Sequence, residues 1–214
     1  HRELAPQAAV DSEEAIASKL RFAQHFSQDE RAAPVLADVA RQLLARGDYA
    51  SAIAAARQLV AREAGAEAEL QLAGYLVIGH SEFAREQYAA AEAAYARALP
   101  LIGAADARRA ATAQRISAAL YRQAQQQRER QEHLAAARLF DRAVAAAPAS
   151  EVAISARYDA AAAYQSAGEL AKASSLLEEF RRLYPEHTLS ADIGVQLVTN
   201  YEALEDWGSA AAEL

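Results

Sequence analysis

Apolar and small residues recur three or four positions apart along most of the chain, and one arrangement of them returns several times. A short turn precedes a large residue, alanine follows three positions later, and further apolar residues follow at helical spacing. The residues that open this arrangement are Tyr49, Tyr88, His133, Leu170 and Trp207. An apolar stripe with this spacing is typical of an amphipathic helix. The sequence therefore predicts one helical unit that is repeated five times.

The distance between units leaves room for two helices in each. Successive opening residues are 39, 45, 37 and 37 positions apart, and each interval accommodates two helices of about 12–15 residues with two turns. Gly47 and Gly168 lie where a left-handed turn would end a first helix, and Pro148 and Pro185 lie where a second helix should stop. Each unit is therefore expected to be a helix pair.

Composition favours an all-α protein and excludes several other classes. The 214 residues include 60 alanines but only 8 glycines and 5 prolines, and there is no cysteine. Such a chain favours helix, and its 53% hydrophobic content is too high for a disordered protein. No segment approaches the ~20 apolar residues of a membrane span. A net charge of −7 argues against general nucleic-acid binding, which requires clustered positive charge.

The second half of each unit resembles the tetratricopeptide repeat (TPR), which is a pair of antiparallel helices. Residues 131–148 fit that pattern without a gap except at His133, where tyrosine is usual, and Gly79 occupies the characteristic glycine position of the family. The resemblance covers residues 12–214 and implies an all-α, right-handed superhelical solenoid. The 37-residue intervals are similar to those of bacterial cell-envelope proteins such as the Tol–Pal coordinator and the lipoprotein of β-barrel assembly. This similarity favours the periplasm or cell envelope over the cytoplasm.

The pattern divides the chain into seven segments. They are a poorly ordered leader at 1–11, the second helix of a truncated repeat at 12–33, repeat 1 at 34–72, repeat 2 at 73–110, repeat 3 at 111–152, repeat 4 at 153–189 and a truncated repeat 5 at 190–214. Residues 104–131 are interpreted as an elongated first helix, and a helix followed by a disordered loop is the alternative. Because the pattern is cut at both ends, we expect a longer protein whose uncapped ends allow self-association.

In a TPR array the first helices line a concave groove, so the resemblance implies that this groove binds a peptide or a partner protein. The candidate groove residues are Arg41, Leu44, His80, Phe83, Tyr121, Gln125, Arg128, Tyr158 and Gln165. Tyrosine and arginine often supply hot spots in interfaces, whereas packing between repeats is the alternative role for each residue. The sequence thus predicts a protein–protein interaction scaffold. The alternative function is a structural spacer that positions a domain outside this segment.

Catalytic and metal-binding patterns are missing from the sequence. No two of the five histidines share a helical face, and no HExxH motif or clustered carboxylates accompany them, so no metal site is predicted. There is no cysteine nucleophile, no G-x-S-x-G motif and no glycine-rich phosphate loop. We therefore predict that the chain has no cofactor and is not an enzyme.

Overall fold

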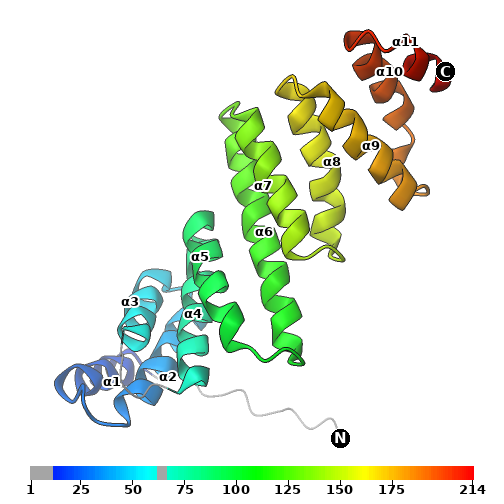
Figure 1. The fold of residues 1–214 in the computed structure, drawn as a ribbon. Coiled ribbons are helices and arrows are strands. Elements are labelled where there is room, and N and C mark those ends of the chain that lie inside the picture. The colour runs from blue at the N-terminus through cyan, green and yellow to red at the C-terminus, as the bar shows by residue number, and fades with distance from the viewer. Residues whose placement is uncertain (1–11, 62–66) are drawn as a thin grey trace, which may run out of the picture. The chain divides into compact units, whose positions relative to one another are not determined.

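The computed structural model describes residues 12–61 and 67–214, and every regular element in these ranges is helical (Figure 1). The predicted all-α fold of paired helices is therefore confirmed, while the predicted leader at 1–11 lies outside the described residues. The helices are α1 (Glu13–His25), α2 (Ala32–Ala45), α3 (Tyr49–Val60), α4 (Ala68–Ala84), α5 (Tyr88–Ala98), α6 (Ala107–Glu129), α7 (His133–Ala146), α8 (Glu151–Ser166), α9 (Leu170–Leu183), α10 (Ile193–Ala203) and α11 (Trp207–Ala212), with 3-10 turns η1 (Leu99–Leu101) and η2 (Thr188–Ser190).

Every opening residue of the sequence pattern is the first residue of a second helix, α3, α5, α7, α9 or α11. The residue two positions earlier adopts a left-handed conformation with φ between 59° and 80° in each unit; these residues are Gly47, Glu86, Gln131, Gly168 and Glu205. The next backbone N–H then donates to the carbonyl five residues earlier, as from Asp48 to Leu43 at 3.0 Å. This turn satisfies carbonyl groups at the end of the first helix and reverses the chain.

Two second helices end just before a proline, as the sequence predicts. Helix α7 ends at Ala146, two residues before Pro148, and α9 ends at Leu183, two residues before Pro185. Proline has no backbone N–H and restricts the residue before it to extended conformations, so the helix stops there.

Small side chains form the contact between paired helices. The alanine three positions after each opening residue is buried: Ala52, Ala91, Ala136 and Ala173 are fully inaccessible, and Ala210 is 5% exposed. Large side chains such as Tyr95, Phe140 and Phe180 fill the remaining space. Close approach at alanine leaves room for these rings one or two turns later, so the core combines small and large residues.

The chain forms two compact units, residues 1–109 and 110–214, and the division falls inside α6. In unit 1, α1 to α5 pack around cores that include Val39, Leu59 and Leu72. In unit 2, Phe140 and Phe180 lie at the centres of two clusters between the helices from α6 to α10.

The repeat boundaries expected at 72/73 and 110/111 fall inside α4 and α6 rather than in loops, and residues 12–33 contain α1 together with the start of α2. First helices lack the turn signal that marks second helices, so their starting points are poorly defined in the sequence. Helix α6 is continuous over 23 residues.

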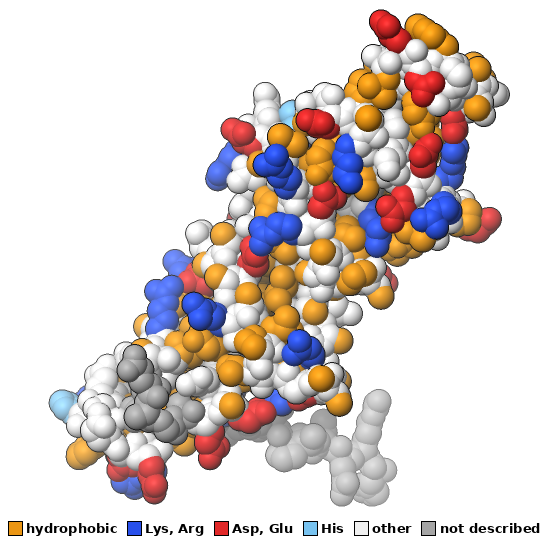
Figure 2. Space-filling view, in the orientation of Figure 1, with side chains coloured by type: hydrophobic (Ala, Val, Ile, Leu, Met, Phe, Trp, Pro, Cys, Tyr) orange, Lys and Arg blue, Asp and Glu red, His pale blue; other side chains and the backbone are white. Residues whose placement is uncertain are grey.

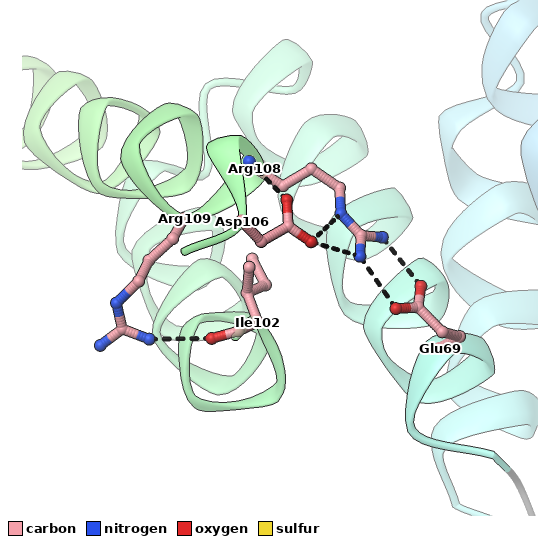
Figure 3. Close-up of polar contacts among 5 residues, drawn as sticks. All are labelled: Glu69, Ile102, Asp106, Arg108 and Arg109. Carbon is pink, nitrogen blue, oxygen red and sulfur yellow. Dashed lines mark hydrogen bonds and ion pairs between the residues drawn. The ribbon is translucent and has the colours of Figure 1, made fainter. Parts of the chain in front are cut away.

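Arginine side chains fix the start of α6 within unit 1 (Figure 3). The Arg108 guanidinium donates to both carboxylate oxygens of Glu69 in α4, at 2.8 and 2.9 Å, and to Asp106 at 2.6 Å. The neighbouring Arg109 donates to the carbonyls of Leu99 and Ile102. These hydrogen bonds lower the pKa of Glu69 and of Asp106 below their usual values, with Arg108 as the main cause.

Candidate functional site

The predicted groove residues all lie on first helices. Arg41 and Leu44 belong to α2, His80 and Phe83 to α4, Tyr121, Gln125 and Arg128 to α6, and Tyr158 and Gln165 to α8. Arg41 and Arg128 are exposed and the other residues are half-buried. The fold thus places every candidate on the first helix of its repeat, and each of them is at least partly accessible to solvent.

In unit 1, the candidates on α4 pack within their own repeat. The His80 ring contacts the Tyr95 ring with centroids 5.6 Å apart, and the Phe83 ring contacts the Tyr88 ring at 5.1 Å. On α2, the Arg41 Nε atom donates to the carbonyl of Ala37. These aromatic contacts hold α4 against α5, so His80 and Phe83 contribute to packing.

In unit 2, a hydrogen bond joins the first helices α6 and α8. The Tyr121 hydroxyl donates to Oδ2 of Asp159 at 2.6 Å, and Arg128 forms an ion pair with Oδ1 of the same carboxylate at 3.2 Å. The Tyr121 ring also packs on Phe140, with centroids 5.3 Å apart. Burial, followed by the hydrogen bond to Asp159, raises the pKa of Tyr121 to about 12. The hydroxyl therefore stays protonated and remains a donor at neutral pH.

The same arrangement recurs between α8 and α10. The Nε2 atom of Gln196 donates to the Tyr158 hydroxyl at 2.7 Å, and the Tyr158 ring packs on Phe180 with centroids 5.6 Å apart. Tyr158 lies 37 residues after Tyr121, and Gln196 lies 37 residues after Asp159. One hydrogen-bonding device thus ties three successive first helices together.

The sequence prediction did not include Asp159 and Gln196. Asp159 directly follows Tyr158. Gln196 directly follows Val195, which stands 37 residues after Tyr158 in the next repeat. That interval was a usable signal. However, pairing a tyrosine with the polar residue of the next repeat requires the distance between neighbouring helices, and sequence spacing does not supply that distance.

The remaining side chains along α6, α8 and α10 differ in chemistry from helix to helix. We call them, together with the tyrosine ladder, the first-helix face of unit 2; its members are Tyr121, Arg122, Gln125, Arg128, Tyr158, Asp159, Ala162, Gln165, Val195, Gln196, Thr199 and Glu202. Arg122 is exposed and donates to Gln125 at 3.0 Å. On α10, Val195 is 72% exposed and Thr199 and Glu202 are exposed. Space-filling representation shows that basic, acidic and apolar side chains alternate over the visible surface of the protein (Figure 2).

In residues 12–61 and 67–214, no group of three histidine, aspartate or glutamate side chains is placed to hold a metal ion. None of the described helices combines the length and the apolar character that crossing a membrane requires.

Comparison with known proteins places this arrangement in context. A family described as outer membrane lipoprotein (YfiO) matches residues 113–201, which contain most of α6 and the helices up to most of α10. The fold is TPR-like. A search of curated proteins gave no match.

Solved TPR-like structures resemble the chain at low sequence identity. The apo form of RapI is 14% identical over 94% of this chain, with a TM-score of 0.49, and the chain spans only 56% of RapI. A kinesin light chain from Podosopora anserina with nearly identical TPR-like repeats is 17% identical, over 83% of this chain and 89% of its own, with a TM-score of 0.41. MamA from Desulfovibrio magneticus RS-1 is 21% identical, over 85% and 90% of the two chains, with a TM-score of 0.42.

Proposed function

We propose that the protein is an interaction scaffold that binds a segment of a partner protein on the first-helix face of unit 2. The observation that carries this proposal is the tyrosine ladder, which joins α6, α8 and α10 through Tyr121–Asp159 and Tyr158–Gln196. The ladder holds three helices in fixed register. A surface that is already ordered loses little conformational entropy when a partner binds, so more of the contact energy appears as affinity.

The ladder also changes the roles that we assign to the predicted groove residues. The hydroxyls of Tyr121 and Tyr158 are occupied by hydrogen bonds between repeats, so their contribution is to build the platform. Direct contacts fall instead to exposed neighbours, namely Arg122 and Arg128 on α6 and Val195, Thr199 and Glu202 on α10. Arginine at the centre of an interface is a frequent hot spot because its planar group forms forked hydrogen bonds.

Charge gives the bound segment a direction. Arginines lie at the α6 end of the face and Glu202 lies at the α10 end, with the exposed Val195 about two turns away on the same helix. A complementary segment carries an acidic side chain over α6, an apolar side chain over Val195 and a basic side chain near Glu202. Opposite charges at the two ends would favour one orientation over its reverse.

The family match supports a place in the bacterial cell envelope. The family described as outer membrane lipoprotein covers residues 113–201, the stretch that carries most of this face. We therefore propose that the partner is a protein of the envelope and that the chain belongs to a larger envelope protein.

A selection from a displayed library of random peptides, followed by affinity measurement, tests the proposal. Arg122→Glu should weaken the selected acidic peptides by roughly tenfold or more, which corresponds to the loss of about one charge-assisted hydrogen bond. The matched control is Arg182→Glu, which reverses an exposed arginine on the second helix α9 and should leave binding unchanged.

Two results would refute this assignment. Selected peptides that bind equally well to the parent and to Arg122→Glu and Val195→Lys variants would place the binding surface elsewhere. A library that yields no specific peptide for the parent would favour the spacer function, in which the segment positions a neighbouring domain without binding a partner on this face.

A further inference from the structure

Neighbouring repeats share a second polar contact that we call the wall contact. It joins a side chain on the second helix of one repeat to a side chain on the first helix of the next. The Tyr164 hydroxyl donates to Asp141 at 2.7 Å, the Tyr201 hydroxyl donates to Glu178 at 2.6 Å, and Arg57 pairs with Glu82 at 3.0 Å; these three pairs are the ones we call wall contacts. Between α1 and α2, Lys19 pairs with Asp38 at 2.6 Å, at other positions of the repeat.

The three pairs occupy equivalent sequence positions. Each second-helix member lies eight residues after the opening residue of its repeat, and each first-helix member lies six residues before the next one. In two of the three, the first-helix member is a tyrosine whose hydroxyl donates to a carboxylate on the preceding second helix. Over all five units the first-helix position holds Leu43, Glu82, Gln127, Tyr164 and Tyr201, so it is aromatic in the last two.

At the first interface, between α1 and α2, the equivalent residues are apolar. Shifting the chain by 158 residues places Leu20 on Glu178 and Leu43 on Tyr201. Both leucines line a cavity of about 420 Å³ that lies between α1, the end of α2 and the start of α3 in unit 1. Leucine stands here in place of the tyrosine of the last two units, and the cavity borders it.

The lining suits an apolar ring with a polar edge. Ile16, Ala17, Leu20 and Leu43 form an apolar floor, and Ile16 and Leu43 are themselves buried. Glu13, Arg46, Asp48 and Ser51 complete the lining with polar groups. A cavity of this volume is within the usual range of ligand pockets, and apolar walls with a few polar groups are their usual composition.

We infer that this cavity binds an aromatic side chain presented by a partner protein, next to the position that Tyr164 and Tyr201 occupy in later repeats. The bound phenylalanine or tyrosine ring packs on Leu20 and Leu43, and a tyrosine hydroxyl reaches the polar edge. This site lies in unit 1 and does not depend on the proposed function of the first-helix face in unit 2.

The test uses p-cresol, the side-chain analogue of tyrosine, and follows the methyl resonances of the protein by NMR. We expect saturable shifts at Ile16, Ala17, Leu20 and Leu43, and at least several-fold weaker binding of 4-methylcyclohexanol, which has the same size but no aromatic ring. Offset ring contacts favour an aromatic guest over a saturated one.

A designed variant fills the cavity with the glutamate–tyrosine pair that a later repeat carries. Leu20→Glu combined with Leu43→Tyr recreates the Glu178–Tyr201 pair and should weaken p-cresol binding by roughly tenfold or more, because the new ring occupies its place. Ala17→Leu narrows the cavity from its exposed side and serves if the double variant does not fold. Leu134→Glu on α7 is the control and should leave binding unchanged.

Three results would overturn the inference. One is the absence of saturable shifts at the cavity methyls, and another is p-cresol binding that persists in a folded cavity-closing variant. The third is a set of cavity shifts that depend on protein concentration without p-cresol, since these would assign the cavity to a second copy of the chain. Loss of p-cresol binding in Arg122→Glu is not expected, so the two proposals fail independently.

Discussion

Replacement of Gly79 by alanine tests the packing between the helices of repeat 2. A Cβ atom at Gly79 in α4 would lie 2.4 Å from Cε1, 2.6 Å from Cδ1 and 2.9 Å from Cζ of Tyr95 in α5. These distances are about 1 Å shorter than ordinary carbon contacts, which are 3.5–4.0 Å. The Tyr95 ring is 2% exposed and packs against His80, so it cannot move aside without disturbing its neighbours.

The magnitude follows from two opposing effects. Overpacking of this kind typically costs ~1–3 kcal/mol, whereas alanine is favoured over glycine within a helix by up to ~1 kcal/mol. We therefore expect Gly79→Ala to lower the free energy of unfolding by ~1–2 kcal/mol. The measurement is urea denaturation followed by the helical circular dichroism signal, for which the midpoint should fall while the slope stays constant.

A second glycine in a helix provides the matched control. At Gly194 in α10, the nearest atom to an added Cβ is Oε2 of Glu213 at 3.7 Å, which is an ordinary contact. Gly194→Ala should therefore leave stability unchanged or raise it. If Gly79→Ala raised stability by the same amount as Gly194→Ala, the close approach of α4 to Tyr95 would be wrong. In a Tyr95→Leu background, the cost of Gly79→Ala should shrink, because the clashing ring is gone.

Three further predictions concern hydrogen bonds and turns. The pKa values of Tyr121, Tyr164 and Tyr201 are raised from 10.0 to about 12, mainly by burial. Because the unfolded chain loses these protons at lower pH than the folded chain, the free energy of unfolding should fall as the pH rises from 10 to 12. Replacing all three by phenylalanine should flatten that decline in urea midpoints, and an unchanged decline would contradict the assignment. Neither amide atom of the buried Asn200 has a hydrogen-bond partner among the described residues, so Asn200→Leu should raise the free energy of unfolding by ~1 kcal/mol. A lower free energy of unfolding in this variant would show that the Asn200 amide forms hydrogen bonds in the folded protein. Gln131 adopts φ of 63° at the turn position where Gly168 adopts 80°. Gln131→Gly should therefore raise the free energy of unfolding and Gly168→Ala should lower it, each by ~0.5–1 kcal/mol in thermal or urea unfolding. Changes of the same sign in both variants would refute the shared turn.

The separation of structural and contact roles on the first-helix face has a practical consequence. Removing the hydroxyl of Tyr121 disturbs Asp159 and, through it, the ion pair of Arg128. A loss of partner binding in a Tyr121 variant would therefore not distinguish a contact from a scaffold defect. Charge reversal at the exposed Arg122 avoids this ambiguity and is the more informative substitution.

The sequence by itself determined where the second helices begin and where two of them end. Tyr49, Tyr88, His133, Leu170 and Trp207 each begin a helix, and Pro148 and Pro185 each follow the end of one. These features depend on local chemistry. Helical periodicity, a left-handed residue and the missing N–H of proline act within a few residues of the chain, so a linear pattern is enough to locate them.

Only the tertiary structure decided which polar side chains meet. Tyr121 bonds Asp159 and Tyr158 bonds Gln196 across 38 residues, and Leu20 and Leu43 line a cavity where later repeats place a tyrosine and a carboxylate. These outcomes depend on how closely two helices approach and on the size of the side chains between them. The sequence repeats the positions, but distance and volume arise only when the helices are packed in three dimensions.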